Sequence, residues 1–258
     1  MLLDALQLPA ACRVQQKIPK KAIAEHARNS ASAARLLQDV VDSIQLVGHI
    51  TPDNSNIAAY QQGEYEYLEI LVFRVQLKEG NWGAGQLKNL HQVLHQAFPY
   101  PLLLEVVSTE QAQWSLATKT VNQANPEHEK LVIQDLLVAD WLTATSDSLQ
   151  QELYQSLLFQ QQNQSNLMLL YQGWLNSFVR YLTAISLNQT TQRDAPASYA
   201  LDPEAAQQQL DRLRQIQDVQ LQISALKNQR DACKQFNEKV ALNLELQKLN
   251  KKLSGLAG

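Results

Sequence analysis

The sequence has 258 residues, of which 45% are hydrophobic and 18% charged, with only 8 glycines. A chain of this length and composition can bury a substantial core, and its scarcity of glycine favours helices over tightly turned β structure. The two cysteines, Cys12 and Cys233, are far apart and in no metal-binding spacing, which argues against a disulfide framework and predicts a cytoplasmic location. Since no apolar run approaches the ~18 residues of a membrane span and Asp4 interrupts the first apolar stretch, neither a membrane partner nor a secretory signal is expected.

The charge is unevenly distributed, although the net charge is only −3. Residues 13–35 carry a net charge of +5 and residues 227–258 a net charge of +4, whereas residues 36–226 carry −11. Basic ends of this kind either neutralise the acidic body or a partner, which is the interpretation with more weight, or contact nucleic acid. The candidate nucleic-acid-binding residues are Lys17, Lys20, Lys21, Lys234, Lys239, Lys248, Lys251 and Lys252.

The first predicted elements are two helices and a strand. Pro19 followed by KKAIAEHA is typical of a helix start. Ser30 or Ser32 is expected to cap a second helix that continues through AARLLQDVVDSI, because apolar residues recur there at helical spacing. The short strand-like run IQLVGHIT then ends at Pro52.

The next part of the chain predicts a sheet. Residues 65–77 are dense in β-branched and aromatic residues and predict a central strand covered on both faces. A turn and a helix, QLKNLHQVLHQAF, follow, and this helix is expected to be a crossover that makes 65–77 parallel to a strand at 101–108. With further strands at 113–120 and 130–141, residues 1–143 predict an α+β domain, an α/β sandwich with a mixed sheet of about five strands.

Residues 146–188 predict a helical segment that packs on this domain. Ser146 or Asp147 is expected to cap its first helix, and the Gln/Asn-rich residues 160–166 to interrupt it. The apolar stripe of the second helix predicts core positions, namely Leu170, Trp174, Phe178, Tyr181 and Leu182. Residues 189–204 contain prolines and no periodic pattern, which is typical of a linker.

Residues 205–256 predict a C-terminal coiled-coil helix or helical hairpin. Two apolar frames are present and do not join, which indicates either a stutter in one long helix or the bend of a hairpin. Because no glycine lies near the junction, a continuous helix is the preferred interpretation. The leucine frame requires a partner helix from residues 147–187, from a second copy or from another protein. The predicted helix-pairing residues are Leu242, Leu246, Leu249 and Leu253.

Sequence motifs for catalysis are weak. His91 and His95 lie one helical turn apart, but Gln92 stands where a zinc protease has its catalytic glutamate, so histidines at a helix surface or an interface are expected. Glu69, Glu105 and Lys119 would be the residues of a degenerate nuclease-like metal site, although no E-x-K motif occurs, and strand-edge charges or ion pairs with Arg74 are the preferred interpretation of these carboxylates. No glycine-rich phosphate loop is present, and neither a cofactor nor a metal is expected.

Several segments resemble a known family. LPAACRVQQKIPKK, EYLEILVFRVQL, AFPYPLLLEV with a following strand that ends in ATK, and KQFNEKVALNLELQKLNKKL are similar to the bacterial domain of unknown function 4391. The resemblance runs from about Leu8 to Leu253. It implies an accessory role beside helicases and DNA methyltransferases in restriction-type or antiphage systems, and it supplies no catalytic residues.

Three functions remain open at this stage. The first is a non-catalytic accessory or scaffold protein that docks on a helicase or methyltransferase subunit, with phosphate contacts to DNA from the basic ends. The second is a divergent metal-dependent nuclease, and the third is a structural homo-oligomer that forms through the C-terminal helix.

Overall fold

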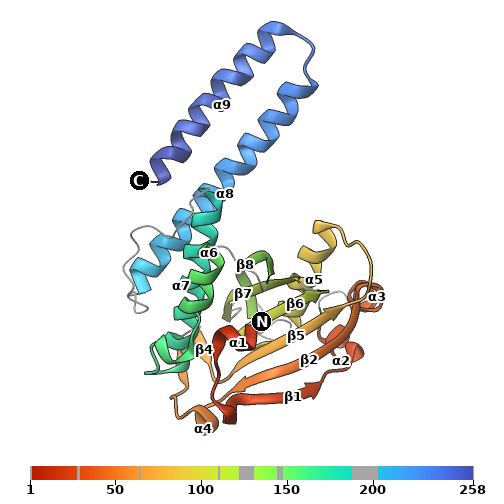
Figure 1. Cartoon of the computed structure of the whole chain (residues 1–258), viewed down its shortest axis with the longest axis vertical. Coiled ribbons are helices and arrows are strands. Elements are labelled where there is room, and N and C mark those ends of the chain that lie inside the picture. The colour runs from red at the N-terminus through yellow and green to blue at the C-terminus, as the bar shows by residue number, and fades with distance from the viewer. Residues whose placement is uncertain are drawn as a thin grey trace. The chain divides into compact units, whose positions relative to one another are not determined.

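The computed structural model describes residues 2–27, 30–63, 65–109, 111–121, 131–143, 148–187 and 203–257 (Figure 1). The chain divides into two compact units, Met1–Phe178 and Val179–Gly258. The predicted linker core and the Ser146 or Asp147 cap lie outside the described residues. Within the ranges described, no helix combines the length and the apolar character that crossing a membrane requires.

The first unit is built on a mixed six-stranded sheet with the order β1-β2-β5-β6-β7-β8. β5 and β6 are parallel, and the other neighbours are antiparallel. This confirms the predicted α+β class, with six strands in the sheet instead of about five. The strands are β1 (Arg13–Lys17), β2 (Val41–Ile50), β5 (Ile70–Leu77), β6 (Leu102–Ser108), β7 (Gln111–Val121) and β8 (Leu131–Thr143), and β3 (Tyr60–Gln62) pairs with β4 (Tyr65–Tyr67) in a separate ribbon.

Three helices cover one face of this sheet. The core on that face combines apolar residues of α2, α3 and α5 with alternate residues of the central strands, such as Leu71, Phe73 and Val75 of β5. The alternation follows from the pleat, which points successive side chains to opposite faces. These helices are α2 (Lys20–His26), α3 (Ser30–Val40) and α5 (Ala84–Ala97).

α6 and the first part of α7 carry the contacts on the other face. The indole of Trp114 on β7 and the ring of Tyr154 on α6 lie with centroids 5.2 Å apart. The predicted stripe of α7 is confirmed as core at Leu170, Trp174 and Phe178, each with 0% exposure. The remaining elements of this unit are α1 (Leu2–Leu6), η1 (Ala10–Cys12), α4 (Pro52–Ser55), α6 (Ser148–Ser156), η2 (Phe159–Gln161) and the part of α7 (Leu167–Ser186) up to Phe178.

The helix α5 is the predicted crossover. It begins after Gly83, at the end of the loop that follows β5, and returns the chain to start β6 beside β5. Leu87, Leu90 and Leu94 recur at spacings of three and four and are buried against the sheet. The expected parallel pairing of the flanking strands is therefore confirmed.

Two predicted boundaries were wrong. The second helix ends at Val40, and Val41 begins strand β2, because β-branched Val41 pairs with Leu77 of β5. The predicted strand 65–77 is divided at Leu68 and Glu69 into β4 and β5. β1 was missed because it is an edge strand whose side chains are mostly exposed, so it has no apolar alternation.

The second unit contains a helical hairpin of α8 (Pro203–Ala232) and α9 (Phe236–Ala257), which run side by side (Figure 1). Val219 and Ile223 of α8 pack against Leu246 of α9 in one apolar cluster. The prediction that favoured one continuous helix over a hairpin was therefore wrong. The chain folds back at residues 233–235, and this lets the two apolar frames that do not join along one helix bury each other.

Candidate functional site

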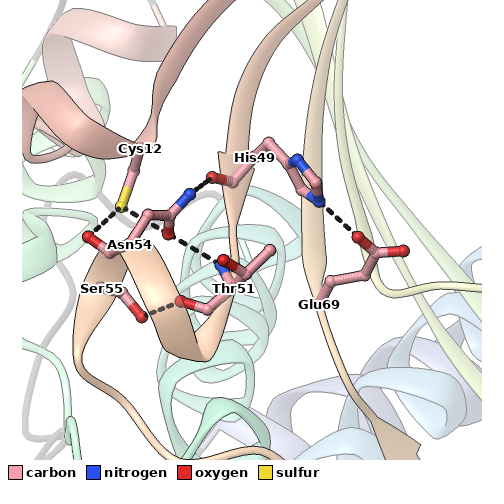
Figure 2. Close-up of polar contacts among 6 residues, drawn as sticks. All are labelled: Cys12, His49, Thr51, Asn54, Ser55 and Glu69. Carbon is pink, nitrogen blue, oxygen red and sulfur yellow. Dashed lines mark hydrogen bonds and ion pairs between the residues drawn. The ribbon is translucent and has the colours of Figure 1, made fainter.

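The side chains of Glu69 and His49 form a hydrogen-bonded pair at one end of the sheet. Glu69 lies immediately before β5, and its carboxylate contacts Nε2 of His49 near the end of β2 (Figure 2). Both side chains are partly buried, with 23% exposure for Glu69 and 34% for His49. Burial and the hydrogen bond and charge of Glu69 raise the pKa of the neighbouring Tyr100 phenol. The first predicted carboxylate is thus already paired.

Asn54 lies in the short helix α4 that follows β2, and its side chain holds this segment in place through three hydrogen bonds. Its amide Nδ2 donates to the carbonyl of His49 (2.8 Å), and its Oδ1 accepts from the Thr51 amide (2.9 Å) and from the thiol of Cys12 (3.3 Å). Figure 2 shows the His49 ring turned toward Glu69 and away from Cys12. Because burial also raises the pKa of the Cys12 thiol, these side chains do not form a nucleophile–base pair.

Lys119 on β7 is partly buried at the same end of the sheet. Its Nζ donates to the carbonyl oxygens of Phe98 and Tyr100, both at 2.8 Å, and burial lowers the pKa of the ammonium to about 7. The cavity beside it, which Glu66 and Tyr171 also line, has a volume of about 10 Å³. Such a space holds one water molecule at most, so it does not admit a substrate.

Glu105 on β6 has a different environment. It is 1% exposed, accepts a hydrogen bond from Arg74 Nε at 2.6 Å, and accepts another from the Trp114 indole at 3.2 Å. This confirms the preferred sequence interpretation of an ion pair with Arg74. The charge of Glu105 is thereby balanced by a neighbouring strand, which is the condition under which a buried carboxylate is tolerated.

The structure does not bring the three nuclease-like candidates together. Glu105 is opposite Trp114, and Lys119 is five residues further along β7, so the two side chains lie on opposite faces of the sheet. Glu69 lies five residues before Arg74, the partner of Glu105, which is about 17 Å along the strand. Among the described residues, no three His, Cys, Asp or Glu side chains are grouped to hold a metal ion.

His91 and His95 belong to a buried polar chain, and their predicted place at a helix surface or an interface was wrong. Both are 0% exposed and face β7 from α5. His91 Nδ1 lies 2.8 Å from Ser115 Oγ and His91 Nε2 lies 3.1 Å from Gln113 Oε1, while His95 Nε2 lies 2.9 Å from the same Ser115 hydroxyl. Gln113 Nε2 then donates to Asp140 at the surface.

One arrangement of protons satisfies this chain. His95 Nε2–H donates to Ser115, the Ser115 hydroxyl donates to His91 Nδ1, and His91 Nε2–H donates to Gln113. Both rings are neutral in this arrangement, in agreement with burial, which lowers the pKa of His91 to about 4 and that of His95 well below its usual value. Nδ1 of His95 has no hydrogen-bond partner.

Of the three candidate lysines near the N-terminus, Lys20 and Lys21 make local contacts. The Lys20 ammonium donates to the carbonyl of Val41, and Lys21 lies 3.9 Å from Glu25 on the same helix. Lys17 is exposed on β1. The other five candidate lysines belong to the second unit, so the two basic segments lie in different units of the chain.

The predicted helix-pairing leucines face a helix of the same chain. Leu246 is 5% exposed and packs on α8, and Leu249 and Leu253 join the same apolar cluster, whereas Leu242 is half-buried. Arg212 on α8 closes the open end of the hairpin by donating from Nε to the carbonyl of Leu256 at 2.8 Å. The partner helix that the leucine frame requires is therefore α8.

The outer face of α9 was not recognised in the sequence. Phe236, Val240 and Leu244 recur every four residues and are 78%, 43% and 54% exposed. Leu244 lies roughly 160° around the helix axis from Leu246, so this apolar face points away from α8. Lys248 and Lys251, four and seven residues after Leu244, extend the same face. The four-residue spacing was the signal that could have identified it.

Comparison with known proteins gives one match. The family model described as domain of unknown function (DUF4391) matches residues 6–253. No curated protein and no solved structure matches the chain. Because the family match spans nearly all of the 258 residues, the chain belongs to the DUF4391 family.

Proposed function

We propose that this protein is a non-catalytic accessory protein, and that the outer face of α9 docks on a larger DNA-processing partner. The observation that carries this proposal is the exposed apolar face of Phe236, Val240 and Leu244 on a helix whose leucine seam is already occupied by α8. Exposed aromatic and aliphatic side chains in a row are the usual anchors of a helix that binds a groove.

The charges beside this face define the partner surface. Lys248 and Lys251 continue the apolar row, and Lys252 is exposed on the following turn. An apolar groove with an acidic rim complements this arrangement, because the lysines then steer the encounter and the apolar side chains supply the affinity. Family resemblance supports a helicase or DNA methyltransferase of a bacterial restriction-type or antiphage system as the owner of that groove.

The geometry does not favour the nuclease alternative. A metal-dependent nuclease needs carboxylates that converge on one ion, and Glu69 and Glu105 are separated along the sheet and individually paired. The homo-oligomer alternative uses the same outer face of α9 and is an outcome of the experiment below.

The test is co-purification of this chain with any helicase and any DNA methyltransferase that is encoded beside its gene. Light scattering on the co-purified sample is expected to give a defined complex with one of them. The double variant Val240→Asp, Leu244→Asp is expected to weaken that complex by about two to three orders of magnitude, since central apolar anchors are each worth roughly 2 kcal/mol.

The double variant Gln215→Asp, Gln217→Asp is the matched control, because it adds the same two charges at exposed positions of α8, outside the apolar face of α9. It is expected to leave the complex intact. Two results would contradict the proposal. One is a homodimer that the double variant dissolves while neither neighbour binds. The other is a monomer that gains mass only with duplex DNA at low salt, in which case the lysines are the working surface.

A further inference from the structure

A second site lies in the first unit, at the end of the sheet opposite Lys119. A pocket of about 470 Å³ opens there, and its wall combines two indoles with amide and hydroxyl groups. The lining residues are Gly80, Asn81, Trp82, Ser108, Thr109, Gln111 and Trp141. The Glu69–His49 pair and the α9 face contribute none of these residues.

The topology gives a reason for a pocket at this place. β5 and β6 are parallel and are joined by the crossover helix α5, and the pocket lies where both strands reach their carboxyl ends. Asn81 and Trp82 belong to the loop that leaves β5, and Ser108 is the last residue of β6. In open α/β sheets, ligands bind in the crevice outside the carboxyl ends of parallel strands.

The backbone around the pocket is held in costly conformations. Thr109 has a φ of 47° and Trp141 a φ of 24°, a region that bulky L-residues rarely adopt. Trp141 lies in β8 where that strand bulges, since the register with β7 shifts between Ala112 and Trp114. A β-bulge changes the direction of a side chain, and this one places the Trp141 side chain at the pocket. Strained backbone conformations are found mainly at functional sites, which supports a function for this pocket.

The position of the Trp82 side chain is fixed by two contacts with the preceding loop. Its Nε1 donates to the carbonyl of Lys78 at 3.2 Å. The Gly80 backbone lies so close to the ring that a Cβ at residue 80 would be 3.0 Å from Trp82 Cζ2. Both indoles of the pocket are half-buried, so each has a fixed position and an accessible part.

We propose that this pocket binds a nucleobase. Indole rings stack on bases of any sequence, and Asn and Gln amides pair with base edges through a donor and an acceptor at once. Asn81 and Gln111 are exposed in the pocket wall, and the hydroxyls of Ser108 and Thr109 add further hydrogen-bonding groups. The proposal is independent of the docking face on α9.

The chemistry of the wall favours a base over a phosphate or a sugar acid. No lysine, arginine, histidine or carboxylate is among the lining residues that the structure describes. The described lining residues give a phosphate no charged partner, whereas a flat neutral ring uses both the indoles and the amides. The base can belong to a single strand or to a free nucleoside, and the experiment separates these two sources.

The test is quenching of tryptophan fluorescence in the full chain. Of the four tryptophans, Trp114 and Trp174 are 1% and 0% exposed, so a ligand in the pocket quenches Trp82 and Trp141. The probes are adenosine and uridine, single-stranded dA and dT oligomers, and maltose. Saturable quenching by a nucleoside or by an oligomer, with none by maltose, is the expected result. Quenching by oligomers only indicates a base within a strand.

Side-chain variants tie the signal to the pocket. Asn81→Ala and Gln111→Ala are each expected to weaken binding about tenfold, the value of one lost bidentate contact. Gln134→Ala on β8 is the matched control, an exposed strand glutamine outside the pocket, and it is expected to bind as the unchanged chain does. The proposal is overturned if maltose alone quenches, if no probe does, or if the affinity survives both pocket variants while circular dichroism shows them folded.

Discussion

His91, Ser115 and His95 illustrate at the scale of single residues how burial sets a protonation state. The sequence places the two histidines one helical turn apart, a spacing equally suited to an exposed face, a metal site or a core. The structure buries both, and the serine hydroxyl between them accepts a hydrogen bond from one ring and donates to the other. Their neutrality follows from burial and makes stability depend on pH.

We expect the free energy of unfolding to fall as the pH is lowered from about 6.5 to about 4. In the folded chain the pKa of His91 is about 4, whereas the unfolded chain has the ordinary value of 6.5 and binds its proton first. At pH 5 the loss attributable to His91 is roughly 2 kcal/mol. Urea denaturation at a series of pH values measures it, with His91→Gln as the comparison. An equal pH dependence in both chains would contradict the assignment.

The Arg74–Glu105 pair yields a second prediction at the residue scale. Arg74→Met leaves the buried Glu105 carboxylate without its cation and is expected to cost about 3–5 kcal/mol. Adding Glu105→Leu removes the stranded charge, so the double variant is expected to be more stable than Arg74→Met alone. A double-mutant cycle by urea denaturation checks this, and strictly additive effects would show that the two side chains do not interact.

At the scale of elements, the strongly patterned segments were predictable and the weakly patterned ones were not. The crossover helix 84–97 and the strand Leu102–Ser108 follow from apolar spacing that agrees with local propensity. β1 could not be predicted, because its sequence RVQQK is polar and its pairing with β2 is a tertiary event. The α3–β2 boundary was missed since Val41 and Ile44 fit a helical stripe as well as a strand.

Two glycines give a matched prediction at this scale. Gly48 on β2 packs so closely that an added Cβ would lie 2.8 Å from Leu8 Cδ1 and 2.9 Å from Val72 Cγ2. Gly48→Ala is therefore expected to lower the free energy of unfolding by about 1–3 kcal/mol. Gly85, in helix α5, has open space at the same atom, so Gly85→Ala is expected to raise stability by about 0.5–1 kcal/mol. Thermal denaturation of both variants tests the pair, and a shift of the same sign would refute it.

At the scale of the whole molecule, the hairpin gives the two faces of helix α9 different roles. The inner face of α9 is used by α8 and supplies stability, whereas the outer face is available to another chain. A leucine seam in a sequence does not distinguish a partner within the chain from one outside it, because both bury the same side chains.

This division predicts opposite results for neighbouring leucines. Leu246→Asp buries a charge between the two helices and is expected to destabilise the hairpin by about 3 kcal/mol or more without changing the molecular mass. Leu244→Asp, at an exposed position, is expected to leave the hairpin intact. Hydrogen exchange of α8 and α9, together with light scattering, distinguishes them. If Leu246→Asp turned a dimer into a monomer with unchanged exchange, the seam would pair two chains.

The sequence by itself determined the features that depend on neighbours along the chain. These are the α+β class, the crossover helix and the buried stripe of α7. Only the tertiary structure decided which face each side chain meets. It buried the two histidines, placed Glu105 and Lys119 on opposite sides of the sheet, and turned the leucine frame inward, because these outcomes depend on strand register and helix packing between residues far apart in the chain.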